Sequence, residues 1–119
     1  MSGNRTYDLE ERLINYAVQI IEVVESLPNT KTAVHLGGQL LSSGTSPALN
    51  YGEAQAAESI RDFIHKMKIV LKELRESKIN LTILERRNLL SDLSAINESN
   101  ELIAIFNKSI TTAKKRSTT

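Results

Sequence analysis

The sequence predicts an all-α protein, an antiparallel up-and-down four-helix bundle with a kinked second helix. Three observations support this fold class. Apolar residues recur at three- and four-residue steps through four long segments, the connections between them are short, and β-branched residues do not alternate with polar ones. Only two prolines occur among the 119 residues. We expect a single domain over residues 1–119, since a chain of this length has room for one core.

The composition narrows the class of protein without selecting a function. The chain has no cysteine, so it can form neither a disulfide framework nor a thiolate metal site. It shows no signal-peptide core and no apolar run long enough to cross a bilayer, so we expect a cytoplasmic protein with no membrane partner. Two Phe, three Tyr and no Trp offer few surfaces for stacking on nucleic-acid bases, and the formal net charge is only +1.

The first helix is expected over about residues 8–26. Thr6 or Asp8 can cap it, because their side-chain oxygens accept hydrogen bonds from free backbone N–H groups. Pro28 ends it, since the residue before a proline is disfavoured in the α conformation. The apolar stripe of this helix is wide and consists of Leu9, Leu13, Ile14, Tyr16, Ala17, Ile20, Ile21, Val24 and Leu27.

The second helix is expected over about residues 31–54, with Thr30 as its cap. Gly44 and Pro47 interrupt this segment, and two interpretations follow. Either one helix bends and continues, or a new helix begins at Ser46. The inward residues of its first half are predicted to be Val34, Gly37, Leu40 and Leu41.

We favour the bent helix because a stronger boundary signal follows it. Ser59 and Asp62 resemble a capping box, which places the turn near residues 56–58. The third helix is then expected over about residues 59–87. Its two apolar rows are Ile60, Ile64, Met67, Leu71, Leu74 and Leu81, and Phe63, Val70 and Leu84.

The fourth helix is expected over about residues 91–114, with Ser91 as its cap. Residues 115–119 are expected to be frayed. The inward seam of this helix is predicted to be Leu93, Ile96, Ile103, Phe106, Ile110 and Ala113.

Residues 44–54 (GTSPALNYGEA), the pair 58–59 and residues 62–69 (DFIHKMKI) resemble a bacterial family encoded by intervening sequences in 23S ribosomal RNA genes, the S23 ribosomal protein-like family. The resemblance covers nearly the whole chain. It implies a four-helix bundle that assembles into a ring, commonly a pentamer, and no enzymatic activity. The chain is also similar to the accessory proteins of diversity-generating retroelements, which are pentameric and bind nucleic acid with a reverse transcriptase.

This chain departs from its relatives in ways that weaken an expectation of nucleic-acid binding. It has Ser42 and Gly52 where relatives often carry arginine, and Ile79-Asn80 where a Tyr-Trp pair is common late in the third helix. The bundle itself does not depend on these positions.

Small residues at four-residue spacing predict a groove where helix backbones approach closely: Gly44, Ala48, Gly52 and Ala56. We interpret Asn50 and Glu53 as side chains that bond across helices or cap the kink, the alternative being that they line a pocket at the centre of the ring. The predicted helix-packing or interface motif comprises Gly44, Ser46, Pro47, Asn50, Gly52 and Glu53.

Basic side chains follow one face of the third helix, at Arg61, His65, Lys68, Lys72 and Arg75. Such a row could follow nucleic-acid phosphates. It could also be a solvated face neutralised by nearby carboxylates, or meet the acidic row of the first helix in a neighbouring subunit. We favour the solvated face, because the aromatic residues expected of a nucleic-acid binder are missing.

Neither a metal site nor a catalytic site is predicted. Asp62 and His65 form half of a di-iron motif, which needs carboxylates from all four helices and two Glu-x-x-His pairs. His35 adds a histidine on another helix, but the ligand set stays incomplete, so we expect no metal and no cofactor. No nucleophile pairs with a base, so we expect no enzyme.

Two function classes therefore remain. The favoured hypothesis is a non-enzymatic homo-oligomeric ring, most simply a pentamer. The other is an accessory protein that binds RNA or DNA through the basic row of the third helix and the cluster Lys114, Lys115 and Arg116.

Overall fold

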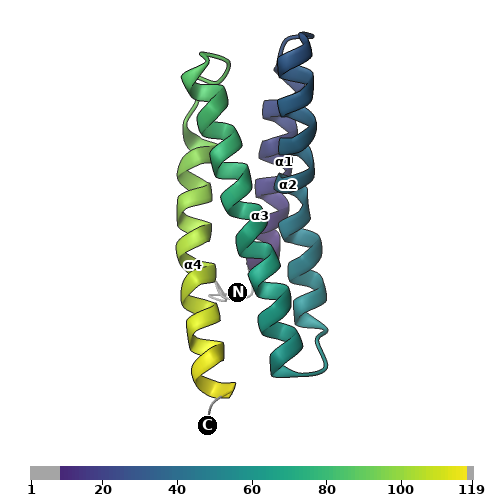
Figure 1. The fold of residues 1–119 in the computed structure, drawn as a ribbon, viewed down its shortest axis with the longest axis vertical. Helices are drawn as coiled ribbons and strands as arrows, with labels where there is room; N and C mark the ends of the chain where they lie inside the picture. Colours follow the sequence, from purple (N-terminus) through teal and green to yellow (C-terminus); the bar gives the residue numbers. More distant parts are fainter. Residues whose placement is uncertain (1–8, 118–119) are drawn as a thin grey trace.

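The computed structural model describes residues 9–117 and contains four helices: α1 (Leu9–Glu25), α2 (Lys31–Gln55), α3 (Ile60–Arg86) and α4 (Ser94–Ser117). The described residues form no strand. Successive helices run in opposite directions (Figure 1), so the predicted up-and-down bundle is confirmed. The predicted caps of α1, Thr6 and Asp8, lie outside the described residues.

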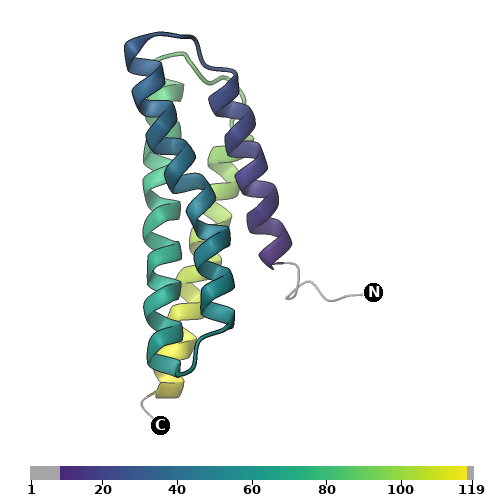
Figure 2. The same ribbon diagram turned by 90° about the vertical axis from the view of Figure 1, so that its right-hand side faces the viewer.

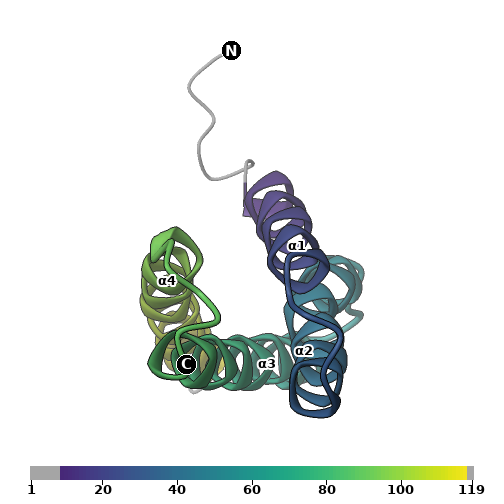
Figure 3. The ribbon, with the colours of Figure 1, turned by 90° about the horizontal axis from the view of Figure 1, so that it is seen from above.

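The four helices are packed unevenly. α3 packs against α2 on one side and α4 on the other, and α1 packs against α2. Seen from above, α1 and α4 face each other at the two ends of this arrangement (Figure 3) and have the sparsest contacts of any packed pair. α1 has 17 residues and the other helices have 24 to 27, so α1 runs beside only the upper part of α2 (Figure 2).

Side-chain caps define the starts of α2 and α3. The Thr30 hydroxyl oxygen accepts a hydrogen bond from Ala33 N at 3.1 Å, and the Ser59 hydroxyl oxygen accepts one from Asp62 N at 3.0 Å. Both predicted caps are confirmed. α2 continues through Pro47 without interruption, so the alternative of a new helix at Ser46 is wrong.

The end of α3 is fixed by a left-handed residue. Asn88 has a φ of 60°, and the backbone N–H groups on either side of this turn reach back into the helix. Asn88 N donates to Glu85 O at 3.0 Å, and Leu89 N donates to Leu84 O at 2.8 Å. This pair of bonds is the Schellman motif, which satisfies carbonyls at a helix C-terminus.

The start of α4 differs from the prediction. The helix begins at Ser94, three residues after the predicted cap Ser91. The Asp92 carboxylate accepts a hydrogen bond from Ser94 N at 2.9 Å, which lowers the pKa of Asp92 and satisfies a free N–H group at the helix start. The helix also runs through Ser117, beyond the expected end at 114 and into the segment expected to be frayed.

The buried stripe of α2 consists mostly of small residues, which corrects the predicted core. Apart from Ser43, the buried positions follow alternating steps of four and three residues: Ala33, Gly37, Leu40, Gly44, Pro47, Tyr51 and Ala54. Val34 is 58% exposed and Leu41 is 39% exposed, although both were expected to face inward. Ile60 and Leu93 are also exposed. The close approach of the helices selects small side chains along the contact line, and the larger residues beside it face outward.

Candidate functional site

A layer of hydroxyl groups crosses the centre of the bundle and includes one residue from each helix. Tyr16 Oη lies 2.7 Å from Ser99 Oγ. Ser77 Oγ donates to Ser43 Oγ at 3.0 Å. All four residues are buried, and burial raises the pKa of Tyr16. The serines of this layer were missed by the sequence analysis, because a serine inside an apolar helix face resembles a surface position until its partners are known.

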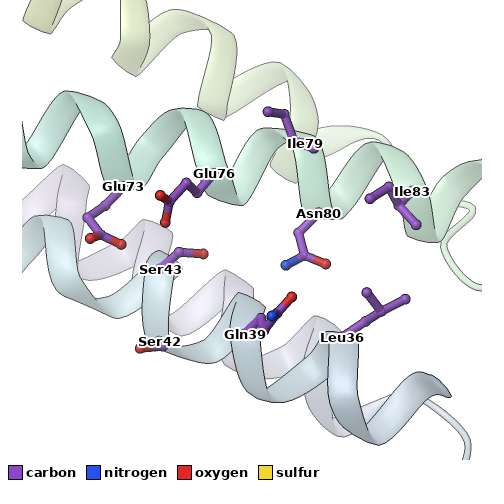
Figure 4. Close-up of a pocket in the computed structure, with 9 residues that line it drawn as sticks. All are labelled: Leu36, Gln39, Ser42, Ser43, Glu73, Glu76, Ile79, Asn80 and Ile83. Atoms are coloured by element: carbon purple, nitrogen blue, oxygen red, sulfur yellow. The ribbon is translucent and has the colours of Figure 1, made fainter. Parts of the chain in front are cut away.

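A groove of about 530 Å³ lies beside this layer, between α2 and α3. Glu73, Glu76 and Asn80 extend from α3 toward α2, where Ser43 and Gln39 face them (Figure 4). The rest of the lining is Leu36, Ser42, Ile79 and Ile83. Asn80 is 9% exposed, and its Oδ1 is buried without a hydrogen-bond partner. A buried polar atom without a partner is unusual in a native structure and costs stability.

The predicted small-residue motif divides into a packed half and an exposed half. At Gly44 an added Cβ would lie 2.6 Å from Ile20 Cγ2, so α1 and α2 are in close contact there. Gly52 is exposed, with nothing within 4 Å of an added Cβ, so the predicted groove does not extend to this residue.

Of the polar residues of the same motif, Asn50 bonds within α2 and Glu53 bonds across to α3. Asn50 Nδ2 donates to Ser46 Oγ at 2.8 Å and to Ser46 O at 3.1 Å, within α2. Glu53 pairs with Lys66 Nζ at 2.7 Å, which joins α2 to α3 and raises the pKa of Lys66.

The predicted basic row lies on the outer face of α3, and its five residues, Arg61, His65, Lys68, Lys72 and Arg75, are all exposed. Lys72 Nζ lies 3.9 Å from Glu73 Oε2, and Arg75 Nη2 donates to Asn107 Oδ1 at 3.4 Å. At the start of the row, a groove that includes Ile60 is also lined by Arg116. The basic cluster that ends α4 therefore lies at the same end of the bundle as Arg61.

The described residues contain neither a metal-binding cluster nor a membrane-spanning helix. Residues 9–117 hold no group of three or more His, Asp or Glu side chains placed to bind a metal ion. Over the same range, no helix combines the length and the apolar character that a membrane span needs.

The model of the 23S rRNA-intervening sequence protein family matches residues 5–111. The chain belongs to this family. No curated protein matches the chain. The chain is also similar to a crystal structure of a protein with unknown function from the S23 ribosomal protein family of Bacteroides thetaiotaomicron VPI-5482, with 32% sequence identity and a TM-score of 0.79. The similarity covers 85% of this chain and 96% of that chain.

The resemblance of the sequence to the 23S rRNA-intervening sequence proteins is thereby confirmed, whereas its similarity to retroelement accessory proteins stays a prediction. Ser42, Ile79 and Asn80, three positions at which the sequence is expected to depart from its relatives, line the α2–α3 groove.

Proposed function

We propose that this member of the 23S rRNA-intervening sequence family is a non-catalytic assembly protein that forms a homo-oligomeric ring. Five copies is the number implied by the resemblance. A ring forms when each copy uses two different surfaces and the rotation between neighbours closes.

The observation that carries the proposal is the set of large apolar side chains exposed on the α1–α2 hairpin. Ile14 and Val18 lie one turn apart on α1 and are 40% and 48% exposed. Val34, Leu41 and Leu49 lie on the outer side of α2, and Leu49 is 69% exposed. Single exposed apolar residues are common on monomers, but several on two neighbouring helices indicate a surface that another protein covers.

The test is the mass of the particle in solution, measured by light scattering at micromolar concentration. We expect a particle of five chain masses for the wild type and a smaller one for Val18→Glu and Leu49→Glu, since a buried carboxylate without a partner opposes assembly. Thr32→Glu, at an exposed polar position of α2, serves as the control and should leave the mass unchanged. A monodisperse wild-type monomer would remove the proposal.

The exposed basic row of α3 favours a second candidate function, binding of RNA or DNA. Lys68 and Lys72 lie one turn apart on the outer face, and binding through phosphates weakens steeply as salt is raised. Reversing both charges, as Lys68→Glu with Lys72→Glu, should abolish binding in a fluorescence-polarisation assay. Lys31→Glu, at an exposed lysine that is the first residue of α2, is the control. Absence of binding by the wild type at low salt would end this candidate.

A further inference from the structure

The α2–α3 groove contains an acceptor that the protein leaves unused. Asn80 Oδ1 is the only buried side-chain nitrogen or oxygen in the described part of the chain that has no hydrogen-bond partner. A leucine at this position would avoid the energetic cost of that buried oxygen. The arrangement therefore indicates a ligand that brings its own N–H or O–H donor to Asn80.

The charge around the groove indicates that this donor belongs to a cation. Glu73 and Glu76 both line the groove, and the lining contains no lysine or arginine. Burial raises the pKa of Glu73, and the neighbouring charge of Glu76 raises it further, because a nearby like charge disfavours the ionised form. Lys72 lies 3.9 Å from Glu73, but its own side chain is 65% exposed, and it is not part of the lining. A bound cation would relieve the repulsion between the carboxylates.

The shape of the groove selects the kind of cation. Leu36 and Ile83 line the groove beyond Asn80 (Figure 4), and Ile79 is the third apolar residue of the lining. An inorganic divalent ion gains nothing from such contacts, whereas an alkyl chain does. Glu76 and Asn80 are four residues apart on α3, which is about 6 Å along a helix axis. A chain of four methylene groups separates two amine groups by a similar length.

We propose that the groove binds a linear aliphatic diamine or polyamine. One ammonium group pairs with Glu76 on the side that faces Glu73, and a second N–H group donates to Asn80 Oδ1. In a longer polyamine, the further methylene groups contact Leu36 and Ile83 beyond Asn80. This inference does not rest on the ring or on nucleic-acid binding.

The experiment is isothermal titration calorimetry of the full chain with 1,4-diaminobutane, butylamine and 1,4-butanediol, at low salt. We expect saturable binding of the diamine, weaker binding of the monoamine and none of the neutral diol. Glu73→Gln and Glu76→Gln should each lower the affinity for the diamine by about tenfold or more, because each removes a charge-assisted hydrogen bond. The control is Glu85→Gln, which removes a carboxylate from α3 outside the groove.

Asn80→Leu separates a binding role from a structural one. This variant should lose the preference for diamine over monoamine and should also melt at a higher temperature, because it removes an unsatisfied buried oxygen. Any of four results would overturn the proposal: no saturable heat with millimolar diamine, equal affinities in wild type and both glutamine variants, equal affinities for monoamine and diamine in the wild type, or displacement of the diamine by millimolar MgCl₂.

Discussion

Replacement of Gly44 by alanine probes the closest contact between α1 and α2. An added Cβ would lie 2.6 Å from Ile20 Cγ2, 2.7 Å from Ile20 Cγ1 and 2.9 Å from Ile20 Cβ. All three distances are too short for carbon atoms in contact. A rotation of the Ile20 side chain cannot relieve the third one, because Cβ is attached to the backbone of α1. The two helices must therefore separate locally to admit the methyl group.

The size of the effect follows from two opposing contributions. Alanine is more favourable than glycine inside a helix by about 0.5–1 kcal/mol. Overpacking a closely packed core costs about 1–3 kcal/mol. We expect Gly44→Ala to lower the free energy of unfolding by about 1 kcal/mol. Gly38 lies in the same helix, exposed, with nothing within 4 Å of an added Cβ, so Gly38→Ala should raise it by about 0.5–1 kcal/mol.

The assay is urea unfolding followed by circular dichroism at one fixed protein concentration, since assembly would link stability to concentration. The difference between Gly44→Ala and Gly38→Ala cancels helix propensity and measures the overpacking alone. With an m-value of about 2 kcal/mol/M, the two midpoints should differ by about 1 M. In an Ile20→Ala background, which opens space at the contact, Gly44→Ala should become neutral or stabilising. Equal stabilities of Gly44→Ala and Gly38→Ala would refute the reasoning.

Two further substitutions test the contacts between α1 and α4. Tyr16→Phe removes the hydroxyl bonded to Ser99 and should lower the free energy of unfolding by about 1 kcal/mol. Because burial raises the pKa of Tyr16, the unfolded chain loses this proton first, so wild-type stability should fall as the pH rises above about 10. The fall should be smaller in Tyr16→Phe, and equal pH profiles in thermal melts would contradict this. Arg12→Lys replaces a guanidinium that lies 2.6 Å from Glu98 and 2.7 Å from Glu101, so amide hydrogen exchange in α1 should accelerate at low salt, whereas Arg61→Lys should leave it unchanged.

The number, order and approximate ends of the helices could be predicted from the sequence because their signals are local. The caps Thr30 and Ser59 act on N–H groups three residues away, within their own helices. The start of α4 was misplaced because Ser91 and Asp92 are both good capping residues, and only the backbone path shows that Asp92 faces the free N–H group. The inward face of α2 was partly misassigned because hydrophobicity favoured Val34, whereas close packing favours Ala33 beside it.

The groove and the hydroxyl layer could not be predicted, since their members meet only across helices. Asn80 follows a buried serine by three positions, but nothing in that spacing shows that its oxygen lacks a partner. From the sequence, Glu73 and Glu76 are two of the nearby carboxylates expected to neutralise the basic row. The direction of a polar side chain on a helix depends on the angle at which the neighbouring helix crosses. That angle cannot be predicted directly from a single sequence.

The hydroxyl layer has a consequence for how the bundle finds its alignment. Rows of leucine and isoleucine tolerate a shift of one helix by one turn along its neighbour, because one apolar side chain can take the place of another. The hydroxyl layer does not tolerate this displacement. If any one helix moved by one turn, about 5.4 Å, buried hydroxyl groups would lose their hydrogen-bond partners among apolar side chains. The layer therefore favours a single axial register of the four helices. If all four positions were aliphatic, the bundle would still fold, but it would no longer favour this register over registers shifted by one turn.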